Sequence, residues 1–231
     1  MKSRAIVISY SHFGEADKYV QFLTQRWGMV TAIAKSARKS RRRYAGGLDL
    51  FCHNEVFFRG DPKGTPYLNE LTVLNSFQKL RADLDKILLA GRLVHWVKKL
   101  ADTHDPIPDV YSLLGQSLTL IERETRTERL EMLALVFKLK LLSCLGVKPQ
   151  LNPKRSGLRT HYFSIESGSL VDHQGQSGHP LSEIERNLLF QSESMKLTQW
   201  ESYEFALPLV DRLSRLMTQF ASYHHQVPLP L

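Results

Sequence analysis

The sequence of 231 residues predicts an α+β protein in which a small five-stranded barrel precedes an all-helical region. Short segments rich in β-branched and aromatic residues fill the first third of the chain. From about residue 80, apolar residues recur instead at the three- and four-residue steps of amphipathic helices. Charge divides at the same place, because residues 1–80 hold 13 Lys and Arg against 6 Asp and Glu, whereas residues 81–231 hold 18 against 17. We therefore expect one domain over residues 1–80 and a second over residues 81–231.

Five strands are expected in the first domain. They cover residues 4–10, 19–24, 29–34, 50–58 and 67–74, and residues 60–66 between the last two have the composition of a hairpin loop. So few short strands favour a closed or partly open barrel, because closure removes the exposed edges of a small sheet.

Four helical segments are expected in the second domain. They cover residues 80–102, 110–124, 127–145 and 182–223, the last with a break near Pro208. The third is apolar nearly all round, since Lys138 and Lys140 are its only charges after residue 132, and it is expected to be the buried centre of the helical part. Between the third and fourth segments, residues 148–180 are rich in Gly, Ser, Pro and His and predict a loop with one short hairpin.

Several protein classes are excluded by simple features of the sequence. No stretch approaches the roughly 18 apolar residues of a transmembrane helix, and the start lacks the apolar core of a signal peptide, so we expect no membrane contact and a cytoplasmic protein. Cys52 and Cys144 are too few for a disulfide framework or a four-cysteine metal site, and they fit a reducing compartment.

Motifs of catalysis are missing. The sequence has no Gly-rich phosphate loop, no His-Glu-x-x-His pair and no Gly-x-Ser-x-Gly turn, and the single carboxylates of the first third give no two-metal cluster. Asp172, His173 and His179 lie close together, but no Cys or paired His completes a tetrahedral site, and the same holds for His224 and His225. We expect a protein that is not an enzyme and holds no cofactor or metal.

The densest charged feature is the basic segment, residues 35–44, in which six of the first nine residues are cationic. Cations packed this closely repel one another, so a polyanion that neutralises them gains Coulomb energy and releases counterions. Arginine adds bidentate phosphate contacts and stacking on bases. The alternative is a solvated basic loop, but the segment follows the third strand of a barrel, an architecture that binds single strands. The expected nucleic-acid contacts are Lys35, Arg38, Lys39, Arg41, Arg42, Arg43 and Tyr44, with Arg4, Lys18 and Arg26 as weaker candidates.

Aromatic side chains near these cations are candidate platforms for base stacking. Core packing is the alternative for each ring, and Tyr44 is distinguished because it lies in the basic segment itself. The candidates are Tyr10, Phe13, Tyr19, Trp27 and Tyr44.

Two groups of motifs stand out in the sequence. Residues 13–20 read Phe-Gly-Glu-Ala-Asp-Lys-Tyr-Val, and Leu23-Thr24, Gly28 and the Ala-Lys-Ser-Ala-Arg of residues 34–38 follow. Residues 137–146 read Phe-x-Leu-x-Leu-Leu-x-x-Leu-Gly, and Pro149 and Leu151 follow. In their order and composition these motifs resemble those of the family of the bacterial recombination mediator RecO, with Ser36 where a Gly is common in the family. The similarity spans the whole chain.

The resemblance implies an N-terminal OB-fold, a C-terminal helical domain and a role without catalysis. It implies binding to single- and double-stranded DNA, and therefore a nucleoid-associated protein, together with annealing of complementary strands. It also implies cooperation with RecR so that RecA replaces single-strand binding protein on gapped DNA in the RecF pathway of recombinational repair. Two alternatives stay open: an OB-fold module that binds RNA, and a nuclease or other enzyme.

One departure from the family concerns zinc. Many members carry a zinc knuckle with two Cys-x-x-Cys pairs after the Pro-x-Leu motif. The corresponding positions here are near Lys154, Gly157, Asp172 and Gly175, none of which is a cysteine. We therefore expect residues 148–180 to resemble a zinc knuckle without its cysteines and to bind no zinc.

The near-neutral helical domain is the expected site for protein partners. An apolar groove rimmed by cations would suit the acidic, hydrophobic C-terminal tail of single-strand binding protein. Phe137, Lys138 and Leu141 are the residues expected near such a groove, with core packing as the alternative for Phe137 and Leu141.

Overall fold

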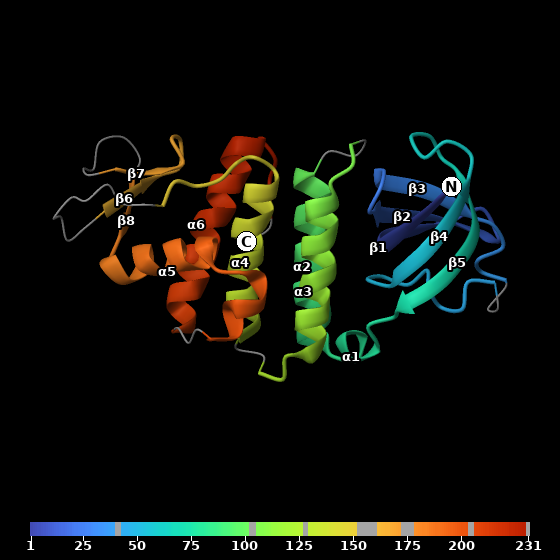
Figure 1. Cartoon of the computed structure of the whole chain (residues 1–231), viewed down its shortest axis with the longest axis horizontal. Coiled ribbons are helices and arrows are strands. Elements are labelled where there is room, and N and C mark those ends of the chain that lie inside the picture. The colour runs from blue at the N-terminus through green and yellow to red at the C-terminus, as the bar shows by residue number, and fades with distance from the viewer. Residues whose placement is uncertain are drawn as a thin grey trace. The chain divides into compact units, whose positions relative to one another are not determined.

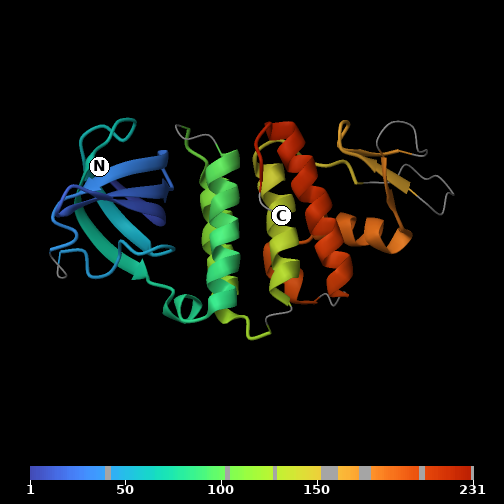
Figure 2. The ribbon, with the colours of Figure 1, turned by 180° about the vertical axis from the view of Figure 1, so that it is seen from behind.

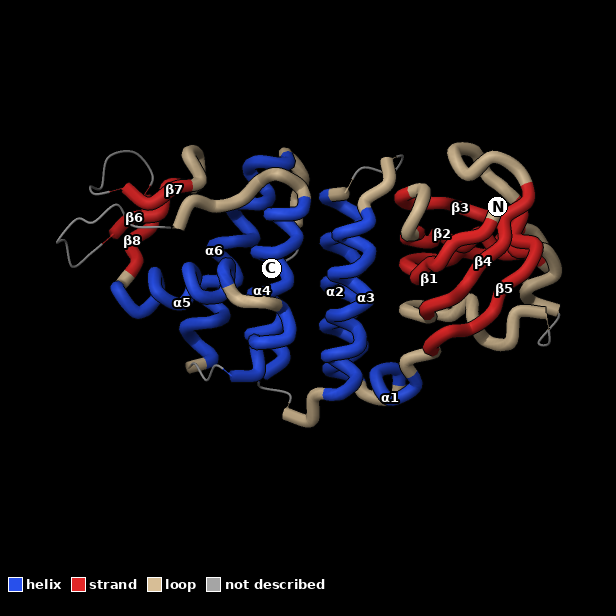
Figure 3. The backbone as a smooth tube through the Cα atoms, viewed as in Figure 1, coloured by secondary structure: helices blue, strands red, loops and turns tan. Residues whose placement is uncertain are grey.

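A computed structural model describes residues 1–39, 43–101, 105–126, 129–151, 161–171, 178–202 and 206–229. The chain divides into two compact units, Met1–Arg123 and Glu124–Leu231. The first holds a β-barrel with helices α1 to α3, and the second holds helices α4 to α6 with a small sheet (Figures 1 and 2). The colouring by secondary structure in Figure 3 separates the strands of the barrel from the helices that follow.

Five strands form the barrel of the first unit. Their order around the closed barrel is β1-β2-β3-β5-β4. Neighbouring strands are antiparallel except β3 and β5, which run parallel where Ile33 pairs with Tyr67. The predicted fold class is confirmed, since a closed five-stranded barrel of the OB type precedes the helices. The strands are β1 (Lys2–Phe13), β2 (Asp17–Thr24), β3 (Gly28–Ala34), β4 (His53–Arg59) and β5 (Tyr67–Asn75).

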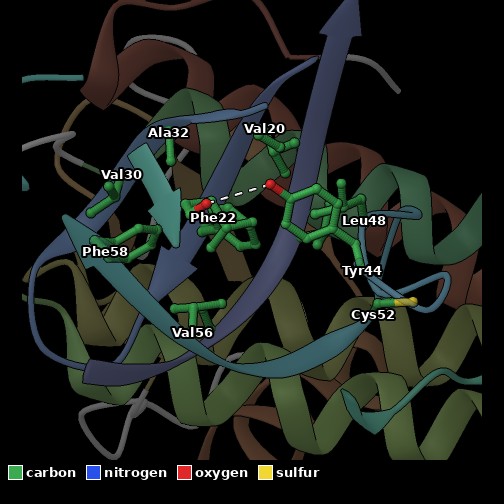
Figure 4. Close-up of a cluster of buried hydrophobic side chains, with 13 residues drawn as sticks. Val20, Phe22, Val30, Ala32, Tyr44, Leu48, Cys52, Val56 and Phe58 are labelled. Carbon is green, nitrogen blue, oxygen red and sulfur yellow. Dashed lines mark hydrogen bonds between the residues drawn. The ribbon is translucent and has the colours of Figure 1, made fainter. Parts of the chain in front are cut away.

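The barrel interior is filled by alternate strand residues and by the segment between β3 and β4. Val20 and Phe22 of β2 point inward with Val30 and Ala32 of β3, as the two-residue period of a strand requires. Figure 4 shows that Tyr44, Leu48 and Cys52 lie among these strand side chains. The segment that begins as the basic segment therefore returns to the barrel and closes its core.

Helices α1 (Gln78–Arg81), α2 (Leu84–Leu100) and α3 (Pro108–Arg123) complete the first unit. The single helix expected over residues 80–102 is split into α1 and α2. Asp83 between them has an extended backbone, and its carboxylate accepts a hydrogen bond from the backbone N–H of Lys86, so Asp83 caps the start of α2. Helix α3 packs on the barrel through Gly115, next to Ile6, and through Tyr111, which hydrogen bonds to His53. The compact unit thus extends past residue 80, while the barrel itself ends at β5.

Helix α4 (Leu130–Cys144) is the centre of the second unit. Most of its residues are buried, and it contacts α5 (Glu183–Ser194), the 3-10 helix η2 (Leu197–Ser202) and α6 (Leu207–His225). The sequence-based prediction of a buried central helix is confirmed. Helix α6 starts with Pro208 in its first turn, which accounts for the break expected there.

A three-stranded sheet occupies the described part of residues 148–180. Strands β6 (His161–Ser164) and β7 (Ser169–Val171) confirm the expected hairpin, and β8 (Gly178–Leu181) pairs with the other edge of β6. Strand β8 was not predicted because it contains Pro180, which edge strands tolerate. The next helix, α5, begins with the expected capping box of Ser182 and Glu185.

Neither a metal cluster nor a membrane span is found in the part of the chain that the structure describes. No three His, Cys, Asp or Glu side chains gather there as metal ligands would. The four positions equivalent to zinc ligands, with His173, fall outside the described residues, so the absence of zinc stays a prediction. None of the described helices combines the length and the apolar character needed to cross a membrane.

Candidate nucleic-acid interface

The basic segment starts at the end of β3 and is tied to the turn between β1 and β2. The backbone N–H of Ser36 donates to the carboxylate of Asp17 at 2.7 Å, and that of Arg38 donates to the carbonyl of Ala16 at 2.9 Å. Ser36 has a φ of 57°, in the left-handed region that favours glycine, which explains why the resemblance places a glycine here. These contacts fix where the first cations of the segment emerge.

The cations that the structure describes in this segment are exposed. The Arg38 guanidinium donates to the carbonyl of Gly14 and the Arg43 guanidinium to the carbonyl of Lys35, both at 3.4 Å. Among the residues described, no carboxylate forms an ion pair with Lys35, Arg38 or Lys39. Their charge is therefore available to an anion. Arg41 and Arg42 lie outside the described residues.

A row of three aromatic rings and Ile33 crosses the outer face of the barrel beside these cations; Phe13 and Tyr67 at its ends are exposed, and Tyr19 and Ile33 are half-buried. Tyr19 of β2 pairs with Ile33 of β3, and Ile33 pairs with Tyr67 of β5. Paired residues project to the same face of a sheet. The neighbours of these residues on β2 and β3 point into the core, so the row faces outward. Because it crosses three adjacent strands, it spans about 10 Å from Tyr19 to Tyr67. Phe13 extends it, with its ring centroid 4.3 Å from that of Tyr19. We call Phe13, Tyr19, Ile33 and Tyr67 the outer row.

Lys35 joins the cations to the outer row. Its Nζ lies 4.5 Å from the ring centroid of Tyr67, a cation–π contact at a ring that is still 44% exposed. Tyr67 was missed as a candidate by sequence reasoning. The available signal was its alternation with Leu68, because a buried Leu68 at the start of a strand puts Tyr67 outside.

Tyr44 is not the exposed stacking platform that the sequence predicted. Its ring is 3% exposed and lies in the barrel core (Figure 4). Its hydroxyl lies 3.2 Å from the carbonyl of Lys35 and 3.4 Å from that of Leu68, and donates its proton between them. Burial raises the pKa of Tyr44, and the nearby Arg43 charge opposes that rise. The residue thus holds together the two backbone segments that carry Lys35 and Tyr67.

The remaining aromatic candidates divide between the two sides of the sheet. Phe13 and Tyr19 belong to the outer row, but Tyr10 pairs with the inward-facing Val20 and therefore lies on the other side, at the mouth of the barrel. Lys18 covers the Tyr10 ring at 4.5 Å. Trp27 packs against Phe58 of the core, so it is not a free platform.

Arg4 and Arg26 lie away from the basic segment, at the other end of the barrel. Arg26 is in the turn between β2 and β3, and the carbonyl of Arg4 accepts a hydrogen bond from Gln25 in that turn. The Arg4 charge is close to the hydrogen bond of 2.6 Å between His53 and Tyr111. Burial, assisted by Arg4, lowers the pKa of His53.

The three residues predicted to contact a protein partner are buried in the second unit. Phe137 and Leu141 are part of the core of α4, and the ammonium of Lys138 donates to the hydroxyls of Ser214 at 2.7 Å and Thr218 at 3.0 Å in α6. In this structure Phe137 and Leu141 pack in the core, which was the alternative to a partner-binding role.

A surface groove of about 490 Å³ lies along α6 and reaches His179 of β8. Leu216 and Pro208 contribute apolar surface, and the guanidinium groups of Arg212 and Arg215 form part of the lining. Arg212 forms an ion pair with Glu185 and Arg215 with Asp211, one turn earlier in α6. The groove therefore combines an apolar surface with two exposed cations, one paired with the buried Glu185 and the other with the exposed Asp211.

Comparisons with known proteins find one family along both parts of the chain. The family model "Recombination protein O N terminal" matches residues 1–77, and the model "Recombination protein O C terminal" matches residues 81–231. The DNA repair protein RecO of Syntrophus aciditrophicus (strain SB) is 32% identical over 177 residues, which cover 73% of this chain and 67% of the relative. The DNA repair protein RecO of Dehalococcoides mccartyi is 30% identical over 190 residues, which cover 78% of this chain and 73% of the relative.

Proposed function

The chain belongs to the RecO family of DNA repair and recombination proteins, and on that basis we propose that it binds single-stranded DNA along the basic segment and the outer row and anneals complementary strands. The observation that carries the proposal is that Lys35, Arg38 and Lys39 are exposed, with no ion pair to a described carboxylate, beside the outer row of an OB-type barrel. Such barrels combine a cationic track for the phosphates with rings on which bases stack.

The contacts proposed here are to phosphates and base faces. Lys35, Arg38, Lys39 and Arg43 would neutralise phosphates, and Arg41 and Arg42, which lie between them in the sequence, would add two more. Phosphates and base faces are common to all sequences, so binding is expected to be insensitive to base sequence. Arg4, Lys18 and Arg26 would make weaker contacts, because they lie at the other end of the barrel or on its other side.

Annealing follows from such a surface. A strand held through its phosphates keeps its Watson–Crick edges free, and neutralised phosphates repel those of a second strand less. Double-stranded DNA, the product of annealing, would be bound through the phosphates by Arg38, Lys39, Arg41, Arg42 and Arg43. We propose that the protein works with RecR, so that RecA replaces single-strand binding protein on DNA, and that it performs this role without catalysing a reaction.

The tail of single-strand binding protein is proposed to bind the groove along α6. The tail is acidic and apolar, and the groove offers Leu216 and Pro208 for apolar side chains and Arg215 for a carboxylate. Arg215 and its partner Asp211 are both exposed, and such a pair contributes little stability, so Arg215 can exchange Asp211 for a carboxylate of the tail at little cost.

An annealing assay tests the proposal. Complementary strands coated with single-strand binding protein are mixed with the wild type or with the triple variant Lys35→Gln/Arg38→Gln/Lys39→Gln. The control variant, Lys99→Gln/Arg123→Gln/Lys196→Gln, loses the same number of charges at exposed positions outside the basic segment. The wild type and the control are expected to accelerate annealing, and the basic-segment variant to lose most of that acceleration. Equal annealing by both variants would remove the basic segment from the function.

The two other function classes have their own outcomes. An RNA-binding module would prefer RNA in a competition between RNA and DNA of the same sequence, whereas we expect no preference for RNA. An enzyme would cleave or modify labelled DNA during incubation with Mg²⁺, whereas we expect the DNA to be recovered unchanged.

A further inference from the structure

Tyr67 and Lys35 form a cation–π contact on the outer face of the barrel. The Lys35 ammonium lies over the Tyr67 ring at 4.5 Å, and the ring is at the end of the outer row. An aromatic face that is exposed and aligned with other rings is the surface on which an unpaired base stacks. In the free protein this face is therefore partly covered by the protein's own lysine.

The backbone on both sides of this contact is held firmly. The N–H of Ile33 donates to the carbonyl of Pro66 at 2.9 Å, next to Tyr67. The buried hydroxyl of Tyr44 lies between the carbonyls of Lys35 and Leu68. The part left free to move is the four-carbon stem of Lys35, and no carboxylate in the described ranges pairs with its ammonium.

We propose that Lys35 is an internal competitor of the nucleobase for the ring of Tyr67. When single-stranded DNA binds, one unpaired base stacks on Tyr67 and the Lys35 ammonium moves to a neighbouring phosphate. The inference rests on the proposed function, because it requires that the barrel binds single-stranded DNA.

The energetics favour this exchange. A cation–π contact at an exposed site is weaker than base–aromatic stacking, and the displaced ammonium gains a phosphate in return. Duplex DNA offers no free base face, so Lys35 stays on the ring when the DNA is paired. Once two strands anneal, their bases leave Tyr67 and Lys35 covers it again. The contact thus selects unpaired strands and helps the duplex product to leave.

A double-mutant cycle tests the competition. The affinity for a labelled oligo-dT, which cannot pair with itself, is measured for the wild type, Lys35→Gln, Tyr67→Leu and the double variant. Tyr67→Leu is expected to weaken binding by about fivefold or more, the loss of one stacked base. Lys35→Gln removes a phosphate contact in both backgrounds, but only where Tyr67 is present does it also free the ring for a base. The loss of affinity caused by Lys35→Gln is therefore expected to be about two- to fivefold smaller in the wild type than in the Tyr67→Leu background.

Two controls separate stacking from packing. Tyr67→Phe keeps the ring and is expected to bind as the wild type does. Tyr10→Leu removes another lysine-covered tyrosine, 42% exposed but on the other side of the sheet, and is expected to change the affinity less than twofold. A Tyr67→Phe loss equal to that of Tyr67→Leu would overturn the stacking role.

The outcomes distinguish this inference from the proposed function. If the wild type binds oligo-dT and Lys35→Gln lowers the affinity by the same factor with and without Tyr67, the proposed competition between Lys35 and a base is wrong, whereas DNA binding is supported. If Tyr67→Leu binds oligo-dT as the wild type does, Tyr67 is not a stacking residue. A wild type that fails to bind oligo-dT would overturn the proposed function and the competition together.

Discussion

Tyr44 shows how one side chain can serve the barrel core and the surface beside it. Its ring packs among residues such as Val20 and Leu48, while its hydroxyl reaches the carbonyls of Lys35 and Leu68. Tyr44→Phe keeps the ring but removes this link, so the free energy of unfolding is expected to fall by about 1 kcal/mol, the net contribution of a typical hydrogen bond. Urea denaturation measures it, with the exposed Tyr223→Phe as the unaffected control. An unchanged stability would show that the hydroxyl contributes no net free energy.

His53 is expected to make the stability of the first unit depend on pH. Burial and the Arg4 charge hold the pKa of His53 below its ordinary value, so the folded protein favours the neutral ring. The unfolded chain binds the proton more readily, and the stabilisation is present above about pH 6.5 and is lost as the pH falls through the lower folded pKa. Stability measured by urea denaturation at pH 7 and pH 5.5 is expected to drop more in the wild type than in His53→Gln. An equal drop in both would contradict this origin.

At the scale of elements, the strands and most helices could be predicted from the sequence because each follows a simple period. Segments rich in β-branched and aromatic residues predicted the five barrel strands, and the long apolar run predicted α4. The deviations have local causes. The N-cap at Asp83 splits a helix although the apolar spacing continues through it, and Pro180 argued against a strand at the position of the edge strand β8. Such features depend on a single hydrogen bond or a position in the sheet, which the period alone does not reveal.

The candidate site was predicted only in part. The cations were found because six of nine residues carry charge, but the sequence does not show which half of the β3–β4 segment returns to the core. Tyr44 was therefore assigned to the surface although it is buried, and Tyr67 was overlooked although alternation with Leu68 places it outside. Phe137 and Leu141 belong to a helix that is apolar on every side, so a partner surface and a core could not be told apart.

The groove on α6 carries a prediction about a protein partner. Arg215→Glu replaces a cation in this groove by an anion and is expected to lower the affinity for a peptide of the acidic tail by about tenfold, the order of a lost charge-assisted hydrogen bond. Fluorescence anisotropy with a labelled tail peptide measures the change. The control is Lys196→Glu, an equal charge reversal at an exposed position outside the groove. Similar affinities of the two variants would exclude the groove as the site.

For the whole molecule, the uneven charge is explained by a basic barrel and a near-neutral remainder. The excess of 13 cations over 6 anions in residues 1–80 is concentrated where β3 ends, beside the outer row. Residues 81–231 hold 18 cations and 17 anions and so have almost no net positive charge to attract a polyanion. We therefore expect protein partners rather than DNA on their surface. Both family models match, one on each part, which places the chain in a family of DNA repair and recombination proteins.

The salt dependence of single-strand binding tests the central claim most directly. If about six phosphates are neutralised, the logarithm of the oligo-dT association constant falls with the logarithm of salt concentration at a slope near −4, and Lys35→Gln/Arg38→Gln/Lys39→Gln reduces the slope to about −2. A wild-type slope near zero, or a triple variant with the wild-type slope and affinity, would contradict the assignment of DNA binding to the basic segment.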